Sequence, residues 1–195
     1  ILDHIIIMDS RVVYPYFLML IDMQSSGIID WAEVKRLAHI MESYLYRLKV
    51  CEMPTNGLNR IIISLCDREK AKSNLHEREI QLLQANFPSD HQLSESLLKV
   101  NLYKLRNNLA KLSLVVLEEK RTKETIDFDN AQVEHIMPRH LTSDWRIQIP
   151  DADKINDQLG GTIGNLTLTK YNQEMSNKTF AEKKKFYEDS NISLT

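Results

Sequence analysis

The chain has 195 residues, of which 43% are hydrophobic and 27% are charged, and its formal net charge is −2. A chain of this length and composition can bury a core in one domain or two small ones, which excludes an intrinsically disordered segment. Five Gly and five Pro are few for an all-β protein, so helices should dominate. Because the net charge is slightly negative, any attraction to nucleic acid has to come from local basic patches.

The sequence gives no sign of a membrane or secreted protein. No run approaches the roughly 18 apolar residues of a membrane span. The apolar run over residues 5–8 is too short for a signal peptide and lacks its basic flank. Cys51 and Cys66 lie in apolar helical patterns without CxxC pairing, which argues against a disulfide scaffold. We expect a cytoplasmic protein with no membrane partner, and the opening at Ile1 within a helical pattern suggests a fragment of a longer parent.

Apolar residues recur every three or four positions from about 10 to 118, which predicts a helical bundle. Pro15 suits the first turn of the first long helix. Asp30, with Glu33 three positions later, resembles a capping box that begins the next helix. The bundle should therefore start with two long helices.

Three more helices are predicted before the pattern ends. One covers 58–65, and another covers 80–87 and is terminated by Pro88. Ser94 is placed to cap a last helix that reaches about Val116. This part of the chain contains no cluster of chemically active side chains at the spacing of a metal or catalytic site.

The pattern changes at the charged stretch over 120–127, so we expect a boundary near 125 that separates a helical bundle domain, 1–125, from a second module, 126–195. In that module, residues 132–136 and 165–169 are predicted to be strands, joined by a polar loop over 139–162.

A helix should end the second module. Thr179 with Glu182 forms another capping box, which opens a helix that runs to about Asp189 and packs Phe180 and Tyr187. The fold class is therefore mainly α with a small α+β part.

Four polar side chains lie around the two predicted strands. An imidazole titrates near neutral pH, so His135 can take a proton from water as a general base. Carboxylate and carboxamide oxygens suit a hard cation such as Mg²⁺, which makes Glu134 and Asn172 candidate metal ligands. Asn165, on the facing strand, is a candidate for orienting the imidazole. Asn177 is the second candidate for the position of Asn172.

Adjacent side chains of a strand point to opposite faces, so Glu134 and His135 can share a site only if the strand ends or bends there. Pro138 allows such an ending. This local geometry is a condition for the predicted chemistry, which is metal-assisted hydrolysis of a phosphodiester bond.

The segment from Val133 to about Leu194 resembles the C-terminal nuclease domain of GmrSD-type, modification-dependent (type IV) restriction enzymes, a branch of the HNH superfamily. The resemblance is carried by residues 134–138, 163–168, Asn172, 176–178 and Tyr187. The helical half loosely resembles the region that precedes that domain. The resemblance implies a helical bundle followed by a ββα-metal (HNH-like) module, with His135 and Asn165 as catalytic residues.

Basic and aromatic side chains near this motif have two open interpretations. Arg139, Lys178 and Lys184 flank the proposed metal site and are candidates for phosphate contacts, although a lysine run is usually a solvated face. Trp145 can stack on a base or form a hydrophobic plug over the loop.

By this resemblance the chain is an endonuclease that needs Mg²⁺ or another divalent ion such as Mn²⁺ and cuts or nicks DNA in defence against foreign DNA. A nucleotide-hydrolysing domain of the same parent protein is a further implied partner. The contrasting hypothesis is a non-catalytic module that binds protein or nucleic acid and keeps only a vestigial motif. RNA is the alternative substrate.

Overall fold

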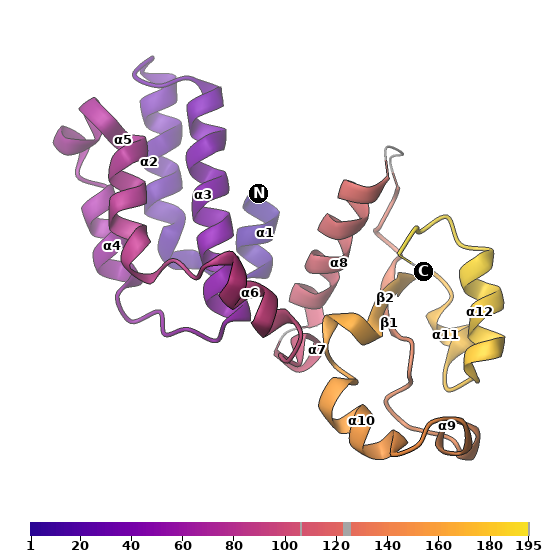
Figure 1. Ribbon diagram of the computed structural model, residues 1–195. Helices are drawn as coiled ribbons and strands as arrows, with labels where there is room; N and C mark the ends of the chain where they lie inside the picture. The colour runs from indigo at the N-terminus through magenta and orange to yellow at the C-terminus, as the bar shows by residue number, and fades with distance from the viewer. Residues whose placement is uncertain (106, 123–125, 195) are drawn as a thin grey trace. The chain divides into compact units, whose positions relative to one another are not determined.

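The computed structural model describes residues 1–105, 107–122 and 126–194, without the side chains of 68–73 and 107. The chain forms two compact units, Ile1–Ser94 and Glu95–Thr195 (Figure 1). The boundary expected near 125 falls at residues outside the described ranges, and the described residues on both sides of it belong to the second unit. The described chain is mainly helical and contains one two-stranded antiparallel sheet, which confirms the predicted fold class.

The first unit is built from helices. Their bounds are α1 Leu2–Ile7, α2 Tyr14–Ser25, α3 Trp31–Val50, α4 Leu58–Leu65 and α5 Arg68–Leu83, with 3-10 turns at Arg11–Val13 and Gln84–Asn86, and α6, Asp90–Leu97, crosses into the second unit. The core of the unit includes the inward stripe of α3, with Leu37, Met41, Leu45 and Leu48 buried. The predicted bundle is thus confirmed for this part of the chain.

Local signals fix the helix ends as predicted. Pro15 lies in the first turn of α2, where a missing backbone N–H costs nothing. The Asp30 carboxylate caps α3 by accepting a hydrogen bond from the Glu33 backbone N–H at 2.8 Å. The helix expected over 80–87 starts earlier, as α5, and its last 3-10 turn ends before Pro88.

The single helix predicted from Ser94 to about Val116 is wrong. Ser94 lies inside α6, which is followed by a short α7, Leu102–Leu105, and then α8, Asn107–Arg121. The Asn101 carboxamide oxygen accepts a hydrogen bond from the Lys104 backbone N–H at 2.8 Å. This cap begins a new helix, because an Asn side chain competes with the helical bonds of the backbone.

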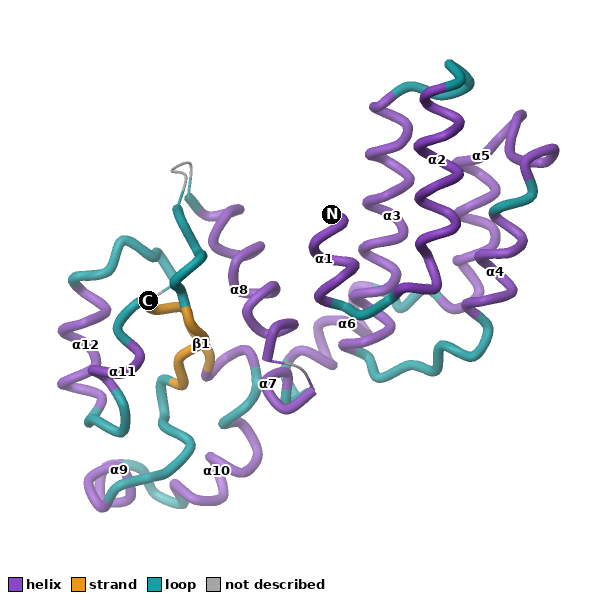
Figure 2. Tube along the Cα trace, turned by 180° about the vertical axis from the view of Figure 1, so that it is seen from behind, coloured by secondary structure: helices purple, strands orange, loops and turns teal. Residues whose placement is uncertain are grey.

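The sheet of the second unit is enclosed by helices. Strands β1, Gln132–His135, and β2, Leu166–Thr169, pack against α8, and α11, Asn172–Met175, packs against β1. Figures 1 and 2 show the strands between α8 on one side and α11 with α12, Phe180–Glu188, on the other. The buried residues of this core include Leu109, Ala110, Leu114, Val133, Leu168, Met175 and Ile192.

The two strands match the predicted ones to within a residue. β1 ends at His135, and β2 begins at Leu166, since Asn165 closes a 3-10 turn, Ile163–Asn165. In the antiparallel register Glu134 faces Thr167 and His135 faces Leu166.

The expected loop over 139–162 instead contains two short helices, α9 Ser143–Gln148 and α10 Ala152–Leu159. Trp145 explains the difference, because its side chain is 4% exposed and packs in a small cluster with Met137 and Ala152. Its indole N–H donates to the Lys178 carbonyl at 3.1 Å. Trp145 is therefore the hydrophobic plug over this segment.

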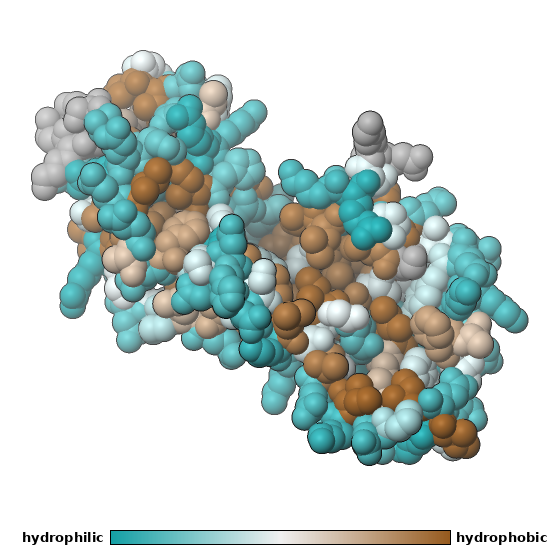
Figure 3. Space-filling model, in the orientation of Figure 1, coloured by the Kyte–Doolittle hydropathy of each residue, from teal (hydrophilic) through white to brown (hydrophobic). Residues whose placement is uncertain are grey.

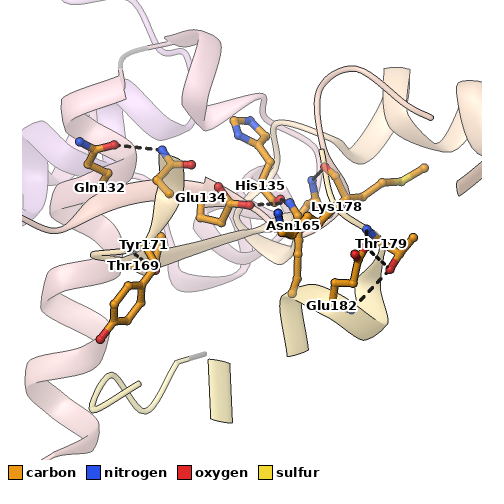
Figure 4. A network of polar contacts seen from close by, with 12 residues as sticks. Gln132, Glu134, His135, Asn165, Thr169, Tyr171, Lys178, Thr179 and Glu182 are labelled. Carbon is orange, nitrogen blue, oxygen red and sulfur yellow. Dashed lines mark hydrogen bonds and ion pairs between the residues drawn. The ribbon is translucent and has the colours of Figure 1, made fainter. Parts of the chain in front are cut away.

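The last helix begins as predicted and packs differently. Thr179 and Glu182 form the full capping box (Figure 4). Phe180, expected to pack inward, is 46% exposed, whereas Lys183 is fully buried. Figure 3 shows apolar side chains over α9 and α10 of the second unit, where Ile147 and Leu159 are exposed. No described helix has the length and hydropathy needed to cross a membrane.

Candidate functional site

The end of β1 brings two adjacent side chains into one pocket. Glu134 and His135 both line a pocket of about 220 Å³, although neighbouring strand residues ordinarily face opposite ways. The strand stops at His135, and the next backbone N–H, of Ile136, donates to the Asn165 carbonyl at 2.9 Å. The strand therefore ends where it must for Glu134 and His135 to share a site.

The pocket gathers most of the predicted site residues. Besides Glu134 and His135 it is lined by Arg139 from the following loop, Asn172 at the start of α11 and Asn177 after it. The remaining lining residues are Tyr103, Val133, Pro138, His140, Ser176 and Lys183. Residues separated by up to 80 positions in the chain thus meet around one small polar hollow.

Glu134 is held by a buried lysine. Its side chain is about 5% exposed, and its Oε1 accepts a hydrogen bond from Lys183 Nζ at 2.5 Å. The same ammonium donates to the His135 carbonyl at 2.7 Å. Burial raises the pKa of Glu134, while Lys183 and a backbone N–H act in the opposite direction. Removing one partner of such a pair leaves a buried charge and costs about 3–5 kcal/mol.

His135 is a neutral imidazole at physiological pH. Burial is the main cause that lowers its pKa, the positive charges of Arg139 and Lys183 act in the same direction, and together they bring the pKa to about 4. The ring is 8% exposed and meets the Tyr103 ring edge to face, with 4.5 Å between centroids and 72° between planes. A neutral imidazole can accept a proton, as a general base must.

Asn165 fixes the turn after β1 and not the imidazole. Its Oδ1 accepts from the Met137 backbone N–H at 2.8 Å, and its Nδ2 donates to the Met137 and Gly160 carbonyls at 3.0 and 2.9 Å. The amide of Asn165 is thereby engaged with backbone oxygens of two residues. Asn165 therefore acts on His135 only through the backbone that follows it, and it does not line the pocket.

Asn172 and Asn177 both reach the pocket. The Asn172 Nδ2 donates to Gln132 Oε1 at 3.1 Å, so the carboxamide oxygen is the atom left for a cation. Between the two asparagines, Ser176 has φ 39° and ψ −128°, a backbone conformation that is strained for a residue with a Cβ. This strained corner turns the chain so that 176 and 177 line the pocket beside Asn172.

The donor set fits a hydrated hard cation. No group of three or more His, Cys, Asp or Glu side chains gathers at metal-site spacing among the described residues. One carboxylate and one or two carboxamides nevertheless suit Mg²⁺, which keeps several waters and takes few protein ligands. The same set is poor in the nitrogen and sulfur ligands that zinc prefers.

Two of the predicted phosphate-binding residues lie outside the pocket lining. Lys178 and Lys184 are exposed, and Lys184 forms an i,i+4 ion pair with Glu188 at 3.6 Å. Arg139 does line the pocket, and its guanidinium carbon lies 5.6 Å from the centroid of the Tyr103 ring.

Sequence reasoning placed Lys183 in the lysine run of the last helix without foreseeing its burial, and it missed Tyr103. The signal for Lys183 was its place four positions before Tyr187, a half-buried residue, on a helix whose other lysines are exposed. Nothing local marks Tyr103, which lies 32 residues before His135 and reaches it only through the tertiary fold.

Comparison with known families decides the relationship. The family of GmrSD restriction endonucleases, C-terminal domain, matches residues 87–195, more than half of the chain. The chain belongs to this family. The match covers the second unit and the pocket at the end of β1, and membership implies nuclease activity on DNA. No curated protein and no solved structure matches the chain.

Proposed function

We propose that this GmrSD-family chain is a metal-dependent, HNH-type endonuclease that nicks or cuts DNA at the pocket beside β1. The observation that supports the proposal is the convergence of a carboxylate, an imidazole and a carboxamide, from Glu134, His135 and Asn172, on one small polar pocket. A phosphodiester needs a proton acceptor for the attacking water and compensation of the charge that develops on the phosphate.

His135 is the general base in this proposal. Its neutral ring removes one proton from the water whose oxygen bonds to phosphorus, the bond from phosphorus to the 3′ oxygen breaks, and the leaving oxygen takes a proton from solvent. Arg139 lines the same pocket and supplies a planar guanidinium for the phosphate oxygens. Asn165 keeps the turn after His135 closed, so the imidazole stays at the pocket wall.

Glu134 and Asn172 are the residues that would hold Mg²⁺ or Mn²⁺, with Asn177 as the second candidate beside them. A bound divalent cation supplies Lewis-acid stabilisation of the phosphate and of the leaving oxygen. Lys183 donates to Oε1 of Glu134 and so fixes the carboxylate at the pocket wall. Lys178 and Lys184, outside the pocket, would extend phosphate contacts along the DNA.

The proposal also covers the setting of the enzyme. As part of a restriction system, the chain would act in the cytoplasm in defence against foreign or modified DNA, together with a nucleotide-hydrolysing domain of its parent protein. These statements are supported by the family relationship.

Cleavage of supercoiled plasmid DNA tests the proposal. We expect nicked or linear product with Mg²⁺ or Mn²⁺ and none with a chelator, and we expect His135→Ala to lower the rate by about 10²–10⁴, the usual contribution of a general base. His91→Ala, which alters an exposed histidine in α6, is the matched control and should keep the full rate.

Equal rates in wild type and His135→Ala would reject this site, and a purified chain that binds DNA without cleaving it under any divalent ion would favour the non-catalytic module. Competition by structured RNA against duplex DNA tests the substrate class. Stronger inhibition by RNA than by DNA of equal length would replace DNA by RNA as the substrate.

A further inference from the structure

One aromatic ring in the pocket touches both of the groups that must cooperate in hydrolysis. Tyr103 meets the His135 imidazole edge to face at 4.5 Å between centroids. The guanidinium carbon of Arg139 lies 5.6 Å from the centroid of the same ring, within the range of a cation–π contact. All three residues line the pocket.

The backbone of Tyr103 is anchored independently of these contacts. The cap by Asn101 starts α7, and the Tyr103 backbone N–H donates to the Gly161 carbonyl at 3.3 Å. A Cβ at Gly161 would lie 2.0 Å from the Asn101 Oδ1, so a larger residue at 161 would displace the side chain that caps α7. The neighbouring Leu102 is fully buried. The start of α7 therefore sits firmly on the turn that precedes β2.

The imidazole needs a neighbour that sets its orientation, and the carboxamide of Asn165 does not supply one. Both of its amide protons are bound to backbone carbonyls. An edge-to-face contact restricts the rotation of a ring, and a guanidinium stacked on an aromatic face keeps its N–H edges free for a phosphate. Tyr103 provides both restraints from one fixed point.

We propose that Tyr103 is a positioning residue that sets the orientation of His135 and the place of Arg139 together, so that the general base and the phosphate-binding cation keep a fixed separation. This inference rests on the proposed nuclease function. It predicts that the ring matters and the hydroxyl does not, because both contacts are made by the ring. It also predicts that the DNA contact of Arg139 depends on Tyr103.

The test compares Tyr103→Phe, Tyr103→Leu and Arg139→Ala in the full chain, with Arg146→Ala as the control for losing an arginine, since Arg146 is exposed and pairs with Asp153. DNA affinity is measured in chelator, and cleavage is measured with Mg²⁺. We expect Tyr103→Phe to stay within about twofold of wild type. Tyr103→Leu should lower kcat by about 10²-fold, as a small misplacement of a catalytic group does, and weaken DNA binding about as much as Arg139→Ala.

The double variant Tyr103→Leu/Arg139→Ala distinguishes coupling from two independent losses. If Tyr103 acts on DNA through Arg139, the double variant binds DNA no more weakly than Arg139→Ala alone. Additive losses, or unchanged DNA binding in Tyr103→Leu, would overturn the inference.

The NMR signals of the His135 ring protons provide a readout that does not depend on catalysis. Tyr103→Phe should keep the ring-current displacement of these signals, and Tyr103→Leu should abolish it. An unmoved signal in Tyr103→Leu rejects the positioning role even if the chain proves to be inactive on DNA. Absence of cleavage by wild type, with a displaced His135 signal, rejects the proposed function and leaves the positioning intact. If Tyr103→Leu does not fold, Tyr103→Met takes its place in each measurement, and a thermal unfolding curve shows which variant is usable.

Discussion

Each unit contains a buried carboxylate, and the two differ in their partners. In the second unit Glu134 is nearly inaccessible and receives the ammonium of Lys183 at 2.5 Å. In the first unit Glu79 is fully buried, and neither of its carboxyl oxygens has a well-formed hydrogen bond among the described residues. Burial raises the pKa of Glu79 to about 8, although an imperfectly aligned contact with Tyr16 acts in the opposite direction.

A displaced pKa therefore does not by itself identify a functional site in this molecule. Glu79 has the larger perturbation, yet no described residue gives it a cation, and no described group of metal-ligating side chains surrounds it. Glu134 has a buried countercharge, an imidazole as its chain neighbour and a polar pocket in front of it. A pocket and charged partners around a carboxylate, more than the size of its pKa shift, distinguish a candidate catalytic group from a carboxylate that is merely buried.

Breaking the buried pair should give the largest effect. Lys183→Met keeps the length of the side chain and removes its charge, which leaves the Glu134 carboxylate buried without compensation. We expect a loss of about 3–5 kcal/mol in the free energy of unfolding, measured by urea denaturation at neutral pH. The Glu134→Gln/Lys183→Met double variant should recover most of this loss. If Lys183→Met is as stable as wild type, the pair is not the element that holds β1 to α12.

The buried Glu79 carboxyl of the first unit predicts a pH dependence. The folded pKa of Glu79, about 8, lies above the ordinary value of 4.5, so the folded state holds a proton that the unfolded state releases. The contribution of Glu79 to stability is therefore fully present below pH 4.5 and is lost as pH rises through 8, with a slope of up to about 1.4 kcal/mol per pH unit.

Hydrogen exchange of the first unit, followed by mass spectrometry between pH 5 and 8 and corrected for the intrinsic exchange rate, measures this slope. Glu79→Gln should remove it. A slope that persists in Glu79→Gln would assign the pH dependence to another group.

The dependence of stability on pH has the opposite sign at His135 in the second unit. Its folded pKa, about 4, lies below the ordinary 6.5, so its contribution to stability is present above pH 6.5 and is lost as pH falls towards 4. NMR titration of the metal-free chain should show this imidazole changing charge near pH 4. A midpoint for His135 near 6.5 would mean that the ring is not enclosed as the pocket indicates.

Some of these features follow from the sequence, and others do not. The strands, the Asp30 cap and the Thr179–Glu182 capping box depend on neighbours within a few positions, so periodicity and capping rules find them. The burial of Lys183 and the approach of Tyr103 to His135 depend on how α12 and α7 pack against the sheet, and no local pattern contains that information.

Asn165 also shows what sequence patterns cannot predict. The sequence indicated that it supports the site, and the structure places it beside the predicted residues. Its actual partners are backbone groups of Met137 and Gly160, which no side-chain pattern can reveal because every residue carries the same backbone. Residue identity thus indicated that this position is polar and close to the end of β1, but not which bonds its side chain makes.

The smallest predicted effect concerns this same carboxamide, a half-buried amide with three hydrogen bonds, in contrast to the poorly bonded carboxyl of Glu79. Asn165→Ala removes three hydrogen bonds and leaves backbone groups of Met137 and Gly160 without partners, so we expect a loss of about 1–3 kcal/mol in the free energy of unfolding. Asn156→Ala is the matched control, because it removes two longer bonds, at 3.3 Å, to the Pro138 and Arg139 carbonyls of the same segment. Asn165→Asp should be worse than alanine, since a carboxylate would face two carbonyl oxygens. If all three variants unfold at the same urea concentration as wild type, the sheet alone holds the turn after His135. Asn165 would then not contribute to the position of the imidazole.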